Sequence, residues 1–333
     1  MVWKFKKLLL IYVKIILLAG SIYAIPSLHF LAGQKMIEAV VSVGEVNKYN
    51  MQLEHASKHM NIPFQRLTKS QLRTDFKTLL LEASPDVVLV FGLGYKVPSE
   101  LFDIPKKGFY NVHFSLLPAY RGHSPVFWQL KNGETTGGVT IHKINEKFDD
   151  GPILAQQAVS ISPGDSYGIY SARLGIESTM LVGNAMMQLN MPDDVHLTKQ
   201  DKEKISYGPA PLLKDLKIHW ESQTAKEIEC IVNASNPDYG GAITLLRGQP
   251  IHILEVSMAQ LNNDNPGEII PGTIVHCDPN YGIFVACKNS QYLRLNIVQS
   301  PEGILSGFKL ASMGINAGEK FDTVPDTTAF TTI

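Results

Sequence analysis

The sequence predicts an α/β fold, in which a Rossmann-like domain with a mainly parallel sheet precedes a small C-terminal β-barrel of the OB-like type. Over residues 13–189, short apolar and β-branched runs alternate with amphipathic stretches, as in repeated βαβ units. Residues 190–211 are polar, charged and Pro-containing, which is typical of a linker. Residues 212–325 contain one helical stretch and several short alternating runs separated by Gly, Pro and Asn, as in a small barrel.

Composition supports two folded domains. The chain has 333 residues, of which 44% are hydrophobic and 18% charged, and this balance excludes disordered, collagen-like and low-complexity classes. The formal net charge of -1 excludes a globally basic nucleic-acid binder. From Ser206 to the end, eight Lys and Arg stand against thirteen Asp and Glu, so the expected barrel is acidic and offers little to phosphates.

The first 24 residues imitate a secretory signal peptide, with a basic start, an apolar run and a small residue at Ala24. Lys14 interrupts that run, and KIILLAG, which ends at Gly20, fits a buried first strand better. Residues 1–12 are then either an N-terminal arm ahead of the domain or an extension that results from an upstream start codon. No apolar run reaches the roughly 20 uncharged residues that a membrane span needs, so we expect a cytoplasmic protein without one.

The remaining elements follow from periodicity and capping signals. Asp165 and Ser166 supply an N-terminal cap for a long helix, and TAKEIECIVNAS predicts a helix at 224–235 ahead of the barrel strands. In the first domain we expect strands at 14–20, 37–43, 86–92, 108–113, 137–144 and 153–161, and helices at about 52–59, 72–83 and 166–189.

Neither cysteines nor histidines predict a metal site. Cys230, Cys277 and Cys287 are odd in number and lack CxxC spacing, so buried free thiols are expected. His55 and His59 have the i, i+4 spacing of metal ligands, but no third ligand lies nearby in the sequence. A solvated helix face explains them better.

Polar groups gather where strands of the first domain end. Asn111 and His113 lie two apart on one strand and therefore project to the same face. Ligands of open α/β sheets bind at that carboxyl edge. An amide beside an imidazole suits a reaction that builds negative charge on a carbonyl oxygen and moves a proton, and Asp149 could orient or charge the imidazole. Taken alone, these residues fit satisfied polarity at a sheet edge and a turn at 149–151 better than a catalytic site.

The intervening motifs are more specific, and with them the chain resembles the folate-dependent formyltransferases. The resemblance reaches from about Lys14 to Phe321. Its second part, with PGTIVHC, YLRLNIVQSPEG and SGFKLASMGINAGEKF, is similar to the C-terminal barrel of the methionyl-tRNA formyltransferases. The motifs of the first part are Asn111, His113, SLLP at 115–118, YRG at 120–122, GVT at 138–140 and FDDG at 148–151.

The resemblance implies transfer of a formyl group from 10-formyltetrahydrofolate to a primary amine, without a metal, by a catalytic domain at 13–189. It gives catalytic roles to Asn111, His113 and Asp149: the Asn111 amide and a protonated His113 would hold the oxyanion, and Asp149 would keep His113 charged. It further implies a pterin site at Phe91, Gly92, Leu93, Gly94, Lys143, Ile144 and Phe148, and a substrate loop at Ser115, Leu116, Leu117, Pro118, Tyr120, Arg121 and Gly122.

The acceptor amine has two candidates. Methionyl-tRNA is the default because the two-domain layout matches that family. However, residues 40–64 contain no Gly- and Arg-rich insertion, and Gly20-Ser21-Ile22 replaces the family's Gly-Thr-Pro. His142 and the FWQL run resemble formyltransferases of nucleotide-linked 4-amino sugars, which makes His142 and His123 candidate acceptor contacts. A folate-binding protein without turnover, or a deformylase, is the alternative of another class. The sequence does not indicate an oligomeric state.

Overall fold

The computed structural model describes residues 13–191, 195–260 and 269–325, so the expected arm at residues 1–12 lies outside the described residues. The chain forms two compact units that interleave in sequence. The first comprises the chain up to His123, Thr136–Ser160 and Ser171–Tyr207, and the second comprises Ser124–Thr135, Ile161–Tyr170 and the chain from Gly208.

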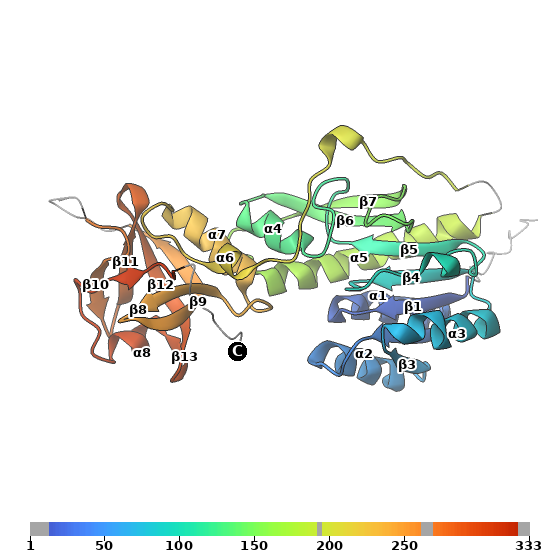
Figure 1. Cartoon of the computed structure of the whole chain (residues 1–333), viewed down its shortest axis with the longest axis horizontal. Coiled ribbons are helices and arrows are strands. Elements are labelled where there is room, and N and C mark those ends of the chain that lie inside the picture. Colours follow the sequence, from blue (N-terminus) through green and yellow to red (C-terminus); the bar gives the residue numbers. More distant parts are fainter. Residues whose placement is uncertain (1–12, 192–194, 261–268, 326–333) are drawn as a thin grey trace, which may run out of the picture. The chain divides into compact units, whose positions relative to one another are not determined.

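The first unit contains a seven-stranded sheet with the strand order β3-β2-β1-β4-β5-β6-β7 (Figure 1). Strands β1 to β5 pair in parallel, whereas β6 and β7 complete the sheet in antiparallel fashion. The predicted Rossmann-like, mainly parallel sheet is therefore confirmed. The strands are β1 (Ile15–Ala19), β2 (Ile37–Val43), β3 (Phe64–Leu67), β4 (Val87–Phe91), β5 (Gly108–His113), β6 (Thr136–Lys143) and β7 (Ile153–Ser160).

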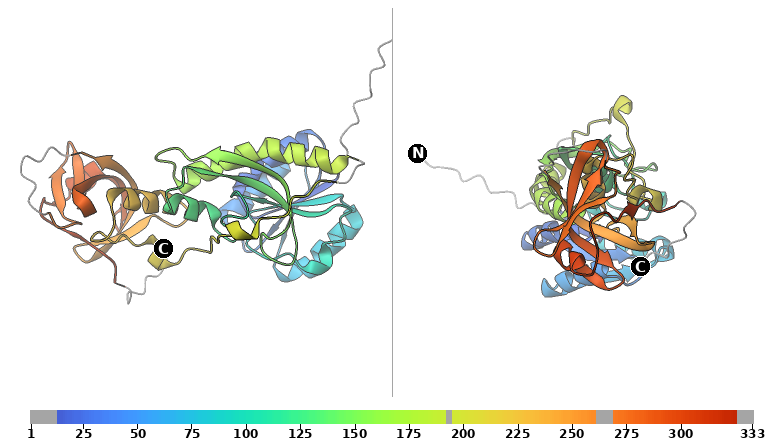
Figure 2. Two further views of the ribbon diagram at one scale, coloured as in Figure 1. Left: turned by 90° about the horizontal axis from the view of Figure 1, so that it is seen from above. Right: turned by 90° about the vertical axis from the view of Figure 1, so that its left-hand side faces the viewer.

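Helices cover both faces of this sheet, which explains why β1 is apolar throughout (Figure 2). Ile16 and Leu18 pack with Phe76 of α3 on one face. Ile15 and Leu17 project to the opposite face, where they are equally buried. The helices of this unit are α1 (Ile25–Gly33), α2 (Lys48–His59), α3 (Asp75–Ala83) and α5 (Tyr167–Asn190), the last of which begins in the second unit.

The sequence did not predict β3 or α1. Helix α1 has no polar face because α5 packs against it, with Ser27 Oγ 3.3 Å from Ser178 Oγ. Gly175 and Gly183 of α5 permit this approach, since a Cβ at either position would lie within 3 Å of Tyr23 or Phe30. A helix that is covered on several sides carries no amphipathic signal.

The second unit is built on a strongly curled antiparallel sheet of the predicted OB-like type, with the order β10-β11-β12-β9-β8-β14 and β13 beside β12 (Figure 1). Its core holds Trp220, whose Nε1 donates to Thr244 Oγ1 at 2.9 Å. The strands are β8 (Ala242–Leu246), β9 (Gln249–Ala259), β10 (Ile274–Asp278), β11 (Gly282–Cys287), β12 (Gln291–Ser300), β13 (Gly303–Ser306) and β14 (Phe321–Asp322).

The described part of this unit contains the helices α4 (Pro125–Lys131), α6 (Leu213–Leu216), α7 (Ala225–Ser235) and α8 (Gly307–Ala311). Helix α7 matches the predicted 224–235 helix and starts with a capping box between Thr224 and Glu227. Helix α4 packs on α7. Phe127 of α4 is buried edge-on to Tyr239, so the FWQL segment forms a helix that contributes core side chains.

The thiols and the paired histidines lie in structural positions. Cys230 and Cys287 are buried and Cys277 is half-buried, all as free thiols, and burial raises the pKa of Cys287 to about 12. The rings of His55 and His59 contact each other on α2. Within the described ranges, no cluster of three His, Cys, Asp or Glu side chains could hold a metal ion. None of the helices described is both long and apolar enough to span a membrane.

Candidate active site

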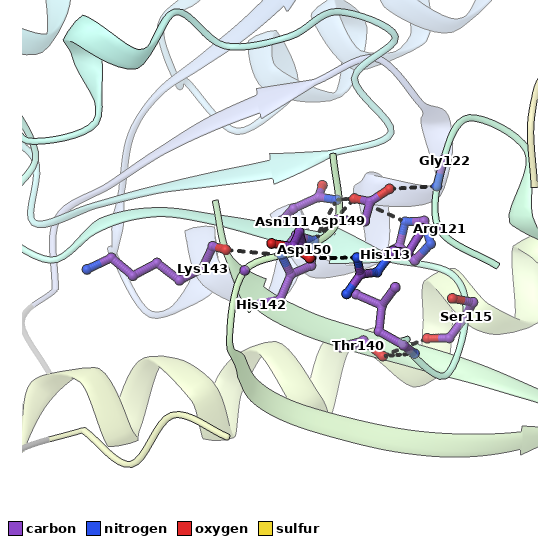
Figure 3. Close-up of polar contacts among 12 residues, drawn as sticks. Asn111, His113, Ser115, Arg121, Gly122, Thr140, His142, Lys143, Asp149 and Asp150 are labelled. Carbon is purple, nitrogen blue, oxygen red and sulfur yellow. Dashed lines mark hydrogen bonds and ion pairs between the residues drawn. The ribbon is translucent and has the colours of Figure 1, made fainter. Parts of the chain in front are cut away.

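Strand pairing assembles the polar cluster at the carboxyl end of β5. Asn111 and His113 of β5 face His142 and Thr140, respectively, across the antiparallel ladder with β6. Beyond β6, the chain turns back before β7, and this loop carries Asp149 to the same edge. The sequence prediction that Asn111, His113 and Asp149 come together agrees with this geometry (Figure 3).

Asp149 is the centre of the cluster. Its Oδ1 lies 3.2 Å from Asn111 Nδ2, 3.3 Å from His142 Nε2 and 3.6 Å from His113 Nδ1. Its Oδ2 accepts a 2.8 Å hydrogen bond from the backbone N–H of Gly122. The carboxylate is only 9% exposed, so water contributes little to its solvation and these groups replace it.

These contacts keep Asp149 ionised. Burial alone would raise the pKa of its carboxyl, but the two histidines and the Gly122 N–H outweigh burial and hold that pKa well below its usual range. Asp149 therefore carries a buried negative charge at neutral pH. That charge faces the imidazole of His113 and would stabilise a proton placed there.

The ring of His113 lies between a backbone carbonyl and the Asp149 carboxylate. Its Nε2 lies 2.9 Å from the carbonyl oxygen of Tyr120, which can only accept, so Nε2 carries a hydrogen. Burial lowers the pKa of His113, the charge of Asp149 acts in the opposite direction, and the net pKa lies below its ordinary value. Nδ1, the other ring nitrogen, faces Asp149.

The amide of Asn111 is committed to the same cluster. Its Nδ2 must face Asp149, because a carboxylate only accepts, and it lies 3.3 Å from His142 Nε2 as well. His142 Nδ1 lies 3.1 Å from the carbonyl oxygen of Lys143 and donates to it, while His142 Nε2 lies 3.3 Å from Asp149 Oδ1. Asn111 Nδ2 thus lies near two atoms of the cluster, at distances near the long limit for hydrogen bonds.

The two histidines that were candidates for the acceptor differ in position. His142 is 2% exposed, and both of its ring nitrogens lie against cluster or backbone atoms. His142 therefore contacts Asn111 and Asp149 directly, and an acceptor contact by His142 stays a prediction. His123 is exposed and lies beside Gly94, where a Cβ would come 3.7 Å from His123 Nε2. An acceptor contact by His123 stays a prediction.

Two side chains of the neighbouring strands β6 and β7 form hydrogen bonds to the backbone of the loop at 115–122. Thr140 Oγ1 donates to the Ser115 carbonyl at 2.6 Å and accepts from the Leu117 N–H at 3.1 Å. Gln156 Nε2 donates to the Leu117 carbonyl and to Thr140 Oγ1. The Leu117-Pro118 peptide bond is cis.

Leu116 and Leu117 of this loop contribute packing. Leu117 is buried, and Leu116 fits only because Gly138 opposite it has no Cβ. The loop therefore reaches the catalytic cluster mainly through two backbone groups, the carbonyl of Tyr120 and the N–H of Gly122. The side chains of the loop matter because their packing sets the positions of these two backbone groups.

The predicted pterin segment divides into buried and exposed positions. Phe91 is 1% exposed and packs edge-on against Phe114, so its side chain belongs to the core. Gly92 has φ +60°, and a Cβ there would lie 2.7 Å from Ser21 Cβ. Only glycine fits this turn. Gly94, Lys143 and Phe148 are exposed, while Leu93 and Ile144 are half-buried, so the pterin contacts expected of these residues stay a prediction.

Arg121 and Gln200 complete the structure around Asp149. Arg121 is 4% exposed, and its Nη1 lies 2.6 Å from Asp150 Oδ1. Its Nε and Nη2 donate to Gln200 Oε1 at 3.1 and 2.7 Å. No sequence pattern indicated Gln200, because this residue stands in a polar run whose composition is that of a linker.

Comparison with known proteins gives the family of the chain. A model of the formyl transferase family matches residues 33–182, and a model of the formyl transferase C-terminal domain matches residues 213–307. The chain is 31% identical over 256 residues to a methionyl-tRNA formyltransferase of Aromatoleum aromaticum, which covers 76% of this chain and 78% of that one. It is 32% identical over 240 residues to that of Pelotomaculum thermopropionicum, covering 68% and 70%.

Solved structures share the fold at low identity. HypX from Aquifex aeolicus superposes with a TM-score of 0.64 at 16% identity, over 92% of this chain and 49% of HypX, so the chain spans about half of that protein. An N-formyltransferase from Helicobacter canadensis superposes with a TM-score of 0.62 at 17% identity, over 85% and 98%. Because both domain models match and relatives at 31% and 32% identity cover more than two thirds of it, the chain belongs to the formyltransferase family.

Proposed function

We propose that this chain transfers the formyl group of 10-formyltetrahydrofolate to a primary amine, with Asn111, His113 and Asp149 as its catalytic residues. One observation carries the proposal: the buried carboxylate of Asp149 lies 3.6 Å from Nδ1 of His113 and 3.2 Å from the amide nitrogen of Asn111. This arrangement provides a proton acceptor, a charge that stabilises the proton once it is taken, and an amide donor for a developing oxyanion.

The reaction follows from these positions. The amine nitrogen attacks the formyl carbon, the new C–N bond forms, and the carbonyl electron pair moves onto oxygen. One N–H of Asn111 exchanges its long contact with Asp149 or His142 for that oxyanion, since a 3.2 or 3.3 Å hydrogen bond is weak.

Proton transfer balances the step. The attacking amine gives a proton to Nδ1 of His113, and the resulting imidazolium is stabilised by Asp149. The intermediate collapses, the bond from the formyl carbon to N10 of tetrahydrofolate breaks, and His113 returns the proton to N10. Nε2 of His113 stays bonded to the Tyr120 carbonyl, which keeps Nδ1 directed at the site throughout.

For the acceptor we propose methionyl-tRNA. The support is that the two relatives described above bear that name and are covered over 78% and 70% of their length, and that the C-terminal domain model matches the barrel. Such an acceptor and a folate donor both fit a cytoplasmic enzyme, which is the compartment we propose.

A nucleotide-linked amino sugar is the second candidate, favoured by one specific observation. Strand β2 ends at Val43 and α2 is capped by Asn47, so the connection is short and contains no Arg. A tRNA acceptor stem would be bound at this connection without the Arg side chains that usually contact phosphates. A sugar nucleotide has fewer phosphates to neutralise.

The test offers both acceptors to the purified chain. The protein is incubated with 10-formyltetrahydrofolate and either methionyl initiator tRNA or a panel of nucleotide-linked amino sugars, and products are analysed by mass spectrometry. A formylated amine supports the proposal and identifies its acceptor. Folate turnover that is independent of any amine would instead indicate a deformylase, and folate binding without turnover a non-catalytic protein.

A further inference from the structure

Residues 195–207, which the sequence predicts as linker, lie along the catalytic loops, and we call them the strap. Two backbone attachments fix the strap. Thr198 exchanges two 2.8 Å hydrogen bonds with Ile153 at the start of β7. Ser206 accepts from the Arg121 N–H at 2.9 Å through its carbonyl and from the Tyr120 N–H at 2.9 Å through its hydroxyl. Gln200 lies between these two attachments.

Gln200 uses its full hydrogen-bonding capacity on the catalytic loops. Its Nε2 donates to the carbonyl oxygens of Asp149 at 2.8 Å and of Gly151 at 2.7 Å. Its Oε1 accepts from Nε and Nη2 of Arg121. A primary amide has two N–H donors and two acceptor sites, and all four are satisfied here. The orientation is unambiguous, because a flipped amide would oppose acceptor to acceptor and donor to donor.

The carboxamide thus joins two loops that carry separate parts of the catalytic cluster. One is the loop of Asp149, whose backbone at φ +50° is in the left-handed region that non-glycine residues rarely adopt. The other is the 120–122 loop, which supplies the Tyr120 carbonyl to His113 and the Gly122 N–H to Asp149. Gln200 contacts neither His113 nor Asn111, so it acts on them only through these loops.

We propose that Gln200 is a positioning residue of formyl transfer, which holds the Asp149 backbone and Arg121 in register so that the Asp149 carboxylate faces His113. This inference rests on the proposed function for its kinetic readout. The strap is accordingly part of the catalytic unit, because its polar side chains form hydrogen bonds with the catalytic loops.

Two substitutions of Gln200 and one matched control test the inference. Gln200→Met keeps the length of the side chain and removes all four hydrogen bonds. Gln200→Glu keeps an acceptor for Arg121 but sets a carboxylate oxygen against the Asp149 and Gly151 carbonyls. Gln188→Met makes the same chemical change at an exposed position on α5. For each we would measure kcat, the KM for 10-formyltetrahydrofolate, Tm, and hydrogen exchange at the Gly122 amide.

We expect both Gln200 variants to lose roughly 10- to 100-fold in kcat, because small displacements of catalytic groups have effects of that size. The KM should change by less than about threefold, since the residue makes no proposed substrate contact. Exchange at Gly122 should become at least about tenfold faster while β4 is unaffected, and Gln188→Met should match the wild type.

Two results would overturn the inference: a kcat of a folded Gln200 variant within about twofold of wild type, or unchanged exchange at Gly122 in both variants. If Gln200→Met does not fold, Gln200→Glu gives the same readouts. If the wild type transfers no formyl group to any amine, the proposed function fails, and exchange at Gly122 still decides whether Gln200 positions the loops.

Discussion

Replacing Asp149 by Asn tests the electrostatic part of the mechanism. The substitution preserves size and keeps an oxygen that can accept from Gly122, but it removes the charge that faces His113. Two unit charges 3.6 Å apart interact with about 4.6 kcal/mol at an effective dielectric constant of about 20. If the imidazolium forms as the amine loses its proton, most of that energy stabilises the transition state.

A loss of this size corresponds to roughly a thousand-fold in kcat, at about 1.4 kcal/mol per factor of ten. The assay is steady-state formyl transfer under saturating donor and acceptor, with a thermal unfolding curve for each protein. Glu146→Gln is the matched control, because it removes one negative charge from an exposed position in the same loop. A folded Asp149→Asn enzyme within about tenfold of the wild-type kcat would refute the charge argument.

The other predictions address the donor, the proton and the loop. Asn111→Ala should reduce kcat by at least roughly 100-fold, because it removes the oxyanion donor, and near-normal turnover would exclude that role. Because burial lowers the pKa of His113, the unprotonated ring persists below its ordinary titration range. A pH profile of kcat/KM should therefore stay level through neutrality and fall only below about pH 6.5, as His113 gains a proton. A value of kcat/KM that falls as the pH rises through neutrality would instead indicate a catalytic imidazolium. Thr140→Val should lower the free energy of unfolding by about 1–3 kcal/mol, because it leaves the Leu117 N–H without its buried acceptor; urea unfolding measures this, and an unchanged midpoint would contradict the assigned support of the loop.

Strand positions were predictable because their signal is local. The runs at 37–43 and 108–113 match β2 and β5, and the two-residue spacing of Asn111 and His113 was enough to place both on one face. Resemblance added Asp149, which spacing alone left as a possible turn residue. The structure shows how it reaches the others, through the antiparallel pairing of β5 with β6.

What the sequence could not predict depends on burial and on contacts distant in the chain. The lowered pKa of His113 was not predictable, because the sequence pattern does not show that the ring is enclosed, with a carbonyl on one nitrogen. Gln200 lies in a run whose polarity usually indicates exposure to solvent. Here its side chain instead forms hydrogen bonds with Asp149 and Arg121, in loops that lie about 50 and 80 residues earlier in the sequence. Helix α1 lacks a polar face because α5 covers it.

The most direct test of the central claim is the mass of the acceptor after incubation with 10-formyltetrahydrofolate and the purified chain. We expect either methionyl-tRNA or a nucleotide-linked amino sugar to gain one formyl group. This gain should disappear in Asp149→Asn. Release of tetrahydrofolate without a formylated amine, or formylation that persists at the wild-type rate in Asp149→Asn, would contradict the central claim.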